Sequence, residues 1–152
     1  MNESQRIADQ MRAAFDGDTW SGRSIRAIVE DLTAARAAAR PVAGAHSAWE
    51  LLLHIKTWLI AGRRRLDGEA YSPSNEQNFP TVTDQSEAAW RQAWTDTERE
   101  YRGLADAIEG LPDARLDDIV PGRTYSVYHL GHGLIQHSLY HAGQIALLAK
   151  AG

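Results

Sequence analysis

The chain has 152 residues, of which 43% are hydrophobic and 24% are charged, with a formal net charge of -4 and no cysteine. This length is typical of one domain with one core, so we expect a single domain over residues 1–152. The mild acidity argues against nucleic acid as a partner, because binding to phosphates relies on clustered Lys and Arg. Without cysteine, disulfides and thiolate metal sites are excluded, and a metal ion would need nitrogen or oxygen ligands.

The first forty residues predict one helix and a short accessory helix. Residues 1–10 are polar and charged, which argues against a secretory signal or a membrane span, so we expect a cytoplasmic protein with no membrane partner. Residues 4–15 have apolar positions at helical spacing up to a break at Gly17, and they predict the first helix. The Ala-rich residues 23–40 predict the accessory helix, which ends before Pro41.

The most clearly marked helix is predicted between Ala48 and Leu66. Ser47, followed by Glu50 three residues later, forms a capping box that satisfies the free amides of the first helical turn. The middle of this segment is apolar on most sides. We therefore expect it to lie in the interior and to pack against several neighbours.

The second half of the chain predicts two further long helices. Residues 67–83 are rich in Gly, Pro and Asn and predict a long crossover loop, which allows the helices on either side to run parallel. Residues 85–111 have an apolar stripe at helical spacing, and Ser126 is the expected N-cap of a last helix that runs to about Lys150. The fold class predicted from these elements is all-α: a four-helix bundle with long crossover connections and a short accessory helix.

Two of the six histidines lie on the core-facing stripe of the last predicted helix. His137 and His141 are four residues apart, which advances a helix by about 6 Å and roughly 40°, so both imidazoles point to the same side. His54 lies in the apolar middle of the helix at 48–66 and is the expected third ligand of a metal ion. Three imidazoles leave a coordination position for water or substrate, as in catalytic zinc sites.

The plainer interpretation is that each of these histidines is a core residue with an ordinary hydrogen bond, which is the commoner role of a single inward histidine. Three imidazoles in one apolar core, however, would leave several ring nitrogens without partners, at roughly 1 to 3 kcal/mol each, unless they share a metal ion. His46 is expected beside the helix cap, and His129 and His132 at the surface or the pocket rim. We therefore leave these three out of the predicted ligand set.

Several other side chains have two open interpretations. Gln144 shares a helix face with the histidine pair and is expected either to hydrogen-bond a ligand histidine or substrate, or to pack in the core. Tyr140, Trp20, Trp49 and Trp58 are expected mainly in the core, with Trp58 also a candidate for the pocket wall.

Two segments resemble motifs of the DinB and YfiT-like superfamily, and the similarity extends over nearly the whole chain. Residues 45–55, AHSAWELLLHI, are similar to the second-helix motif of that family, which ends in a ligand histidine. Residues 133–145, GLIQHSLYHAGQI, are similar to its last-helix motif, in which two histidines separated by three residues precede a small residue, Gly and Gln. The resemblance implies a helical bundle whose metal ligands are His54, His137 and His141.

The resemblance also implies a homodimer and, as in some relatives, transferase or isomerase activity with a low-molecular-weight thiol. We therefore predict a metal-dependent enzyme that acts on a small molecule, either as a thiol-dependent S-transferase or as a hydrolase. The alternatives are a non-catalytic metal-binding protein of stress response or interaction, and a metal-free helical scaffold. Zinc and nickel are the leading candidates for the divalent ion, because imidazole suits both. The sequence identifies neither a catalytic residue nor a substrate.

Overall fold

The computed structural model describes residues 1–151, which form seven α-helices and one 3-10 helix and contain no extended strand. Four of the helices are long: α1 (Glu3–Asp16), α4 (Ala48–Leu66), α6 (Glu87–Glu109) and α7 (Val127–Ala151). The connections contain the short elements α2 (Ile25–Val29), α3 (Ala34–Ala38), α5 (Asn75–Asn78) and the 3-10 helix η1 (Asp113–Asp117). The all-α prediction is confirmed.

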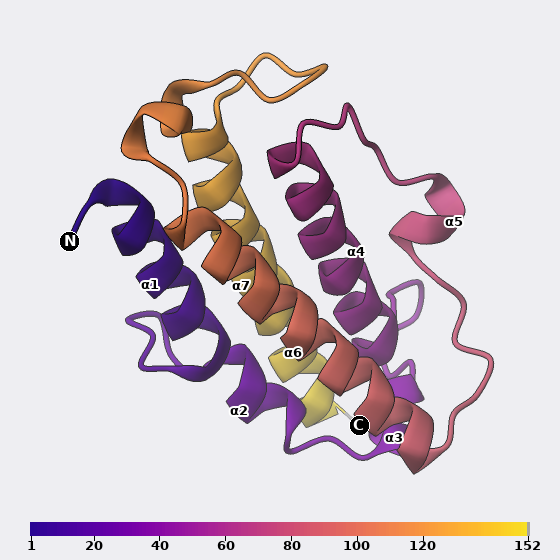
Figure 1. The fold of residues 1–152 in the computed structure, drawn as a ribbon. Coiled ribbons are helices and arrows are strands. Elements are labelled where there is room, and N and C mark those ends of the chain that lie inside the picture. The colour runs from indigo at the N-terminus through magenta and orange to yellow at the C-terminus, as the bar shows by residue number, and fades with distance from the viewer. Residues whose placement is uncertain (152) are drawn as a thin grey trace.

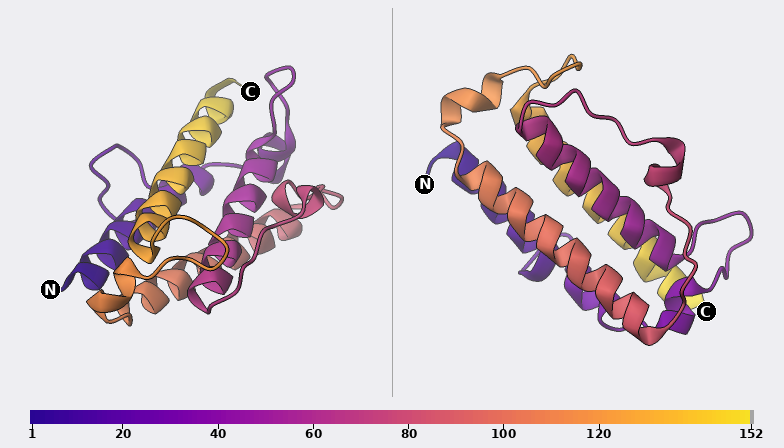
Figure 2. Two further views of the ribbon diagram at one scale, coloured as in Figure 1. Left: turned by 90° about the horizontal axis from the view of Figure 1, so that it is seen from above. Right: turned by 45° about the vertical axis from the view of Figure 1, so that its right-hand side comes forward.

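The four long helices contact one another in pairs. Contacts join α1 to α6, α6 to α4, α4 to α7 and α7 to α1. Figure 1 shows α4 and α6 running in one direction and α1 and α7 in the other. In the right-hand view of Figure 2, α4 lies over α7 and α6 lies over α1. Because α4 and α6 are parallel, the chain between them returns along the outside of α4 before α6 begins (Figure 1).

The helix starts are determined by capping side chains. In α4 the Ser47 hydroxyl accepts a hydrogen bond from the Glu50 amide at 3.1 Å, and the Glu50 carboxylate accepts one from the Ser47 amide at 2.7 Å. The predicted capping box is therefore confirmed, and α4 has the predicted bounds. The Ser126 hydroxyl accepts from the His129 amide at 3.3 Å, which is the geometry of the N-cap predicted for α7.

The accessory helix was predicted incorrectly, because residues 23–40 form two short helices, α2 and α3. The break comes where the Thr33 hydroxyl accepts a hydrogen bond from the Arg36 amide at 3.3 Å and caps a new helix. Between the two helices Leu32 turns into the core, and its carbonyl accepts from the Trp90 indole at 3.0 Å. A hydroxyl side chain within an Ala-rich stretch thus competes with continuous helical hydrogen bonding.

The core lies between the long helices. Its largest fully buried side chains come from α1, α2, α4, α6 and α7: Ile7, Met11, Phe15, Ile25, Val29, Leu52, Ile55, Leu59, Tyr101, Leu104, Ile108 and Ile145. Within residues 1–151, no helix combines the length and the apolar character that crossing a membrane requires.

Two aromatic residues expected in the core lie at the surface. The exposed fraction is 102% for Trp20 and 67% for Tyr140, whereas Trp49 is buried as expected. Trp20 lies in the turn after α1, where no helix pattern determines its direction. Tyr140 precedes His141 by one residue, or about 100° around the helix, and therefore points away from the interior.

Candidate metal centre

Helices α4 and α7 bring the three predicted histidines together. His54 lies in α4 and His137 and His141 in α7, and one ring nitrogen of each lies within 4.8 Å of the others. His54 is buried and the other two are partly buried. Two nitrogens bound to one zinc ion at about 2.0 to 2.1 Å in tetrahedral geometry are roughly 3.3 Å apart. Small ring rotations would therefore give the cluster the spacing of a metal site.

A glycine allows α4 and α7 to approach each other beside this cluster. A Cβ atom added at Gly62 in α4 would lie 2.5 Å from the Leu134 Cδ1 atom of α7, which is closer than non-bonded carbons approach. A side chain at Gly62 would therefore displace Leu134, which faces the site one turn before His137.

Two of the imidazoles have one ring nitrogen that is hydrogen-bonded to an oxygen. His54 Nδ1 is 2.8 Å from the Asn78 carbonyl oxygen, which only accepts, so Nδ1 carries the proton and Nε2 the lone pair. His141 Nδ1 is 2.6 Å from Gln144 Oε1 and donates to it in the same way. Metal-binding histidines commonly donate their second ring nitrogen to such an acceptor, which fixes the tautomer. Gln144 was expected either to hydrogen-bond a ligand histidine or substrate, or to pack in the core, and in the structure it hydrogen-bonds His141.

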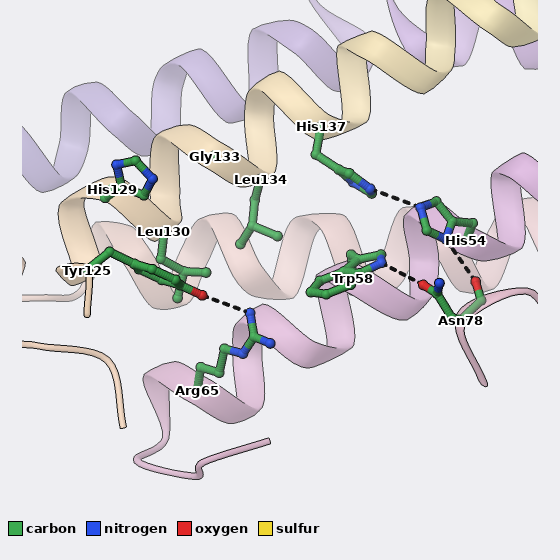
Figure 3. A pocket seen from close by; sticks show the side chains of 10 residues that line it. All are labelled: His54, Trp58, Arg65, Asn78, Tyr125, His129, Leu130, Gly133, Leu134 and His137. Carbon is green, nitrogen blue, oxygen red and sulfur yellow. Dashed lines mark hydrogen bonds between the residues drawn. The ribbon is translucent and has the colours of Figure 1, made fainter. Parts of the chain in front are cut away.

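The lone pairs that result favour a bound cation. His54 Nε2 and His137 Nε2 are 3.0 Å apart, and a dashed line joins the two rings in Figure 3. With Nδ1 protonated, His54 and His141 both have a free lone pair on Nε2 in the same cluster. A neutral His137 carries a single ring proton, so it can donate a hydrogen bond to only one of these two lone pairs. Its Nδ1 is buried without a hydrogen-bond partner among residues 1–151. The donor set is therefore compatible with a divalent metal ion.

Burial keeps the three imidazoles in the form that binds metal. Burial, together with the neighbouring His141 and His54, lowers the pKa of His137 to about 4. Burial also lowers the pKa of His54, despite the hydrogen bond to Asn78 that raises it, and it lowers the pKa of His141. All three rings are consequently neutral at neutral pH, as ligation requires.

An aromatic stack covers one side of the cluster. The Phe79 ring lies 4.2 Å from the His54 ring at an interplanar angle of 3°, and 3.8 Å from the His46 ring at 4°. His46 also lies 3.6 Å from a Glu50 carboxylate oxygen. It thus borders the site through Phe79 and is not part of the histidine cluster.

A pocket of about 370 Å³ lies beside the cluster, between α4 and α7 (Figure 3). Its walls include the apolar side chains of Trp58, Leu130 and Leu134. The remaining lining residues are His54, Arg65, Asn78, Tyr125, His129, Gly133 and His137. This volume suits a small molecule, and the apolar walls offer it a surface on which to bury apolar groups.

The two remaining histidines of α7 lie away from the cluster. His129 is exposed and lines the pocket, as expected for a rim residue. His132 is partly buried, with its ring centroid 4.5 Å from that of Tyr128, and its Nε2 is buried without a partner in the described part of the chain.

Four residues of the site have no counterpart in the sequence prediction: Asn78, Phe79, Arg65 and Tyr125. Asn78 and Phe79 belong to the long connection and approach His54 only through its folded path. Arg65 is 5% exposed and lines the pocket. The sequence could have predicted this position, because Arg65 follows His54 by eleven residues and therefore lies only about 20° around the helix from it. Because Arg65 stands in a run of three arginines with Arg63 and Arg64, the run looks like an ordinary exposed basic helix end.

A comparison with known families confirms the resemblance stated from the sequence motifs. The family model of the DinB superfamily matches residues 18–145, a segment that contains all three histidines of the cluster. The chain belongs to the DinB superfamily. No curated protein and no solved structure matches it significantly, so no activity is transferred to this DinB-superfamily chain from an individual relative.

Proposed function

We propose that this DinB-superfamily protein is a metal-dependent enzyme that acts on a small molecule. The observation that carries the proposal is the convergence of three histidine ring nitrogens beside a pocket of about 370 Å³. His54, His137 and His141 would hold the ion, with zinc or nickel favoured by the imidazole ligands. When bound, the ion supplies Lewis acidity that polarises a substrate or lowers the pKa of a thiol or water.

The chain's own residues support an open centre. Among residues 1–151, the cluster includes no fourth His, Cys, Asp or Glu, so the protein supplies three ligands. Gln144 and the Asn78 carbonyl hold two of the rings in orientation by accepting their Nδ1 protons. Three protein ligands with a position left for water or substrate characterise catalytic sites, whereas structural sites are closed.

The pocket wall favours thiol transfer over hydrolysis. None of the ten lining residues is a carboxylate, and His129 at the rim is the one histidine among them that lies outside the cluster. Zinc hydrolases commonly place a carboxylate beside the metal-bound water as general base, whereas a thiol whose pKa the ion lowers is a nucleophile as its thiolate. We therefore place a thiol-dependent S-transferase, using a low-molecular-weight thiol, ahead of a hydrolase.

The same lack of carboxylates is also compatible with the non-catalytic alternative. A protein that only stores or senses a metal ion, or that uses the ion to stabilise an interaction module, needs the three histidines and no further polar group in the pocket. Turnover decides between this alternative and the enzyme.

We propose in addition that the four long helices form a single four-helix-bundle domain with crossover topology, and that two chains form a homodimer in the cytoplasm. The pairwise contacts of α1, α4, α6 and α7 support the bundle. The exposed Trp20, Tyr140 and Leu147 support the dimer, because large apolar side chains at a surface often mark an interface. Light scattering tests the dimer against the chain mass of 16.8 kDa.

The test of the function begins with metal analysis. Protein expressed with added zinc or nickel is expected to contain one ion per chain, and metal-free protein to bind one ion in titration. The loaded protein is then incubated with bacillithiol, mycothiol or glutathione and a panel of electrophiles, and thiol consumption is followed. A His137→Ala variant is the matched control, and it should consume none.

Each result has a separate meaning. No ion bound at saturation would remove the metal centre and with it the enzyme. An ion bound without thiol transfer, but with hydrolysis of ester or amide substrates, would select the hydrolase. An ion bound with neither reaction would favour the non-catalytic alternative.

A further inference from the structure

The pocket has a cationic end as well as the histidine end. Arg65 is 5% exposed, yet it forms no ion pair with a carboxylate of residues 1–151. Its Nε–H donates to the Tyr71 carbonyl at 3.0 Å and its Nη1–H to the Tyr125 hydroxyl at 3.1 Å. A guanidinium has five N–H donors, so three of them have no protein acceptor in the described chain.

The neighbouring arginines of α4 show that this lack of a partner is specific. Arg63 pairs with Asp67 at 3.1 Å and Arg64 with Glu69 at 2.5 Å, both at the surface. The buried member of the run is thus the one without a counter-charge. Burying a charged group is unfavourable unless an opposite charge compensates it, and a guanidinium does not escape by losing its proton.

A second cation lies beside the first. Arg123 donates from Nη2 to the same Tyr71 carbonyl at 3.2 Å, and it also has no carboxylate partner among residues 1–151. Burial, and then the charge of Arg123, lower the pKa of Arg65, although the Tyr125 hydroxyl opposes them. Two guanidinium groups at one carbonyl produce a positive potential at this end of the pocket.

An apolar surface separates the two ends. The Arg65 guanidinium carbon is 5.2 Å from the Trp58 ring centroid, and the Trp58 ring is 5.9 Å from the His137 ring. Figure 3 shows Arg65 and Tyr125 at one end of the pocket and the histidines at the other, with Trp58 and Leu134 between them. A ligand that reaches both ends must be elongated, with an apolar middle.

We propose that the pocket binds an elongated small molecule whose terminal carboxylate pairs with Arg65 while its reacting group lies beside His54 and His137. The two Nη atoms of a guanidinium match the two oxygens of a carboxylate. This inference rests on the proposed function, because it takes the histidine end as the reacting end. Arg65 is here a specificity residue, which selects substrates by the charge at their far end.

A purely structural role is the competing explanation for Arg65. Its two hydrogen bonds connect the end of α4 to the chain at Tyr71 and Tyr125, and this connection alone would explain its burial. In that case, the pocket would not distinguish a charged ligand end from a neutral one of the same length.

The test uses two matched probes on the cobalt-loaded full chain. 6-Mercaptohexanoate and 6-mercaptohexanol have the same thiol and the same carbon chain and differ in the terminal group. Thiolate-to-cobalt charge-transfer absorption reports the arrival of sulfur at the histidines, and calorimetry gives Kd. We expect the acid to bind roughly ten- to a hundredfold more tightly, the range for a hydrogen bond to a charged group. The shorter 3-mercaptopropionate should lose most of this advantage over its alcohol analogue.

Variants assign the preference to one residue. Arg65→Met keeps the length of the stem and should abolish the preference for the acid while leaving the Kd of the alcohol unchanged. Arg64→Met removes the same charge from the adjacent surface position and should keep the preference, which controls for general electrostatics. If Arg65→Met does not fold, the wild-type comparison of acid and alcohol still decides.

The readouts separate the two proposals. Absorption with both probes but equal Kd values in the wild type overturns the carboxylate subsite and leaves the metal centre in place. A preference for the acid that persists in a folded Arg65→Met variant also overturns the subsite. No charge-transfer absorption with either probe, in protein that takes up cobalt, overturns the use of the histidine end for thiols.

Discussion

The two groups that accept hydrogen bonds from the clustered histidines, and so orient their rings, come from different parts of the fold. His141 donates to the Gln144 side chain, three residues later in α7, whereas His54 donates to the main-chain carbonyl of Asn78, in the connection between α4 and α6. The first contact follows from helix geometry alone, and the second requires the connection to take one particular path. A substitution can remove the first acceptor but not the second. The two sides of the site should therefore respond differently to mutation.

The largest expected effect is the loss of a ligand from either side. His54→Ala in α4 and His137→Ala in α7 should each abolish measurable binding of zinc or nickel. Each variant keeps only two of the three imidazole ligands, which is fewer than zinc sites in proteins use. Helix content should change little, since the apolar core carries the fold. Metal titration and circular dichroism measure both. His129→Ala, at the pocket rim, is the control and should retain the ion, and wild-type affinity in either ligand variant would refute that assignment.

The contrast between the two sides also explains which features the sequence predicted. Helix spacing placed His137, His141 and Gln144 on one face, and the capping box fixed the start of α4, so the helix-borne part of the site was readable. Asn78 and Phe79 were not, because no local pattern determines which residues of a long connection return to a helix.

The same limit applies elsewhere in the fold. The helix break at Thr33 depends on a single capping hydroxyl, which competes with an Ala-rich pattern that favours continuity. The exposed position of Trp20 depends on a turn, where apolar character does not determine direction. Local periodicity thus predicted the long helices, whereas the turns and connections depended on tertiary contacts.

The next effect in size concerns pH in the metal-free protein. The buried histidines have a lowered pKa, about 4 for His137, whereas in an unfolded chain their pKa is about 6.5. Protons therefore favour the unfolded chain, so the stability contribution is complete above about pH 6.5 and is lost as pH falls toward about 4. Thermal unfolding from pH 7.5 to 4.5 should show a falling Tm. His137→Leu should flatten the profile, and a wild-type Tm that does not depend on pH would contradict the buried neutral rings.

A smaller effect is expected from the acceptor on the α7 side. Gln144→Leu removes the oxygen that accepts from His141 Nδ1, so the tautomer with Nε2 free is no longer favoured. We expect metal affinity to fall by roughly ten- to a hundredfold, the usual cost of losing such a partner. Competition with a chromogenic chelator measures the affinity. Gln144→Glu keeps an acceptor at this position and should bind the ion at least as tightly as the wild type, which a simple packing role would not explain.

The smallest effect is expected on the side of the connection. Asn78→Ala removes the Oδ1 atom that accepts from Trp58 Nε1 at 2.9 Å but leaves the carbonyl that accepts from His54. The unfolding free energy should fall by about 0.5 to 1.5 kcal/mol, as for one hydrogen bond, while metal affinity stays nearer the wild-type value than in Gln144→Leu. Denaturant unfolding and the same chelator competition measure these quantities, and Trp58→Phe removes the other partner of the bond. A loss of affinity in Asn78→Ala as large as in Gln144→Leu would mean that the Asn78 side chain, through Trp58, holds the connection in place, and that the main-chain acceptor is no more robust than the side-chain one.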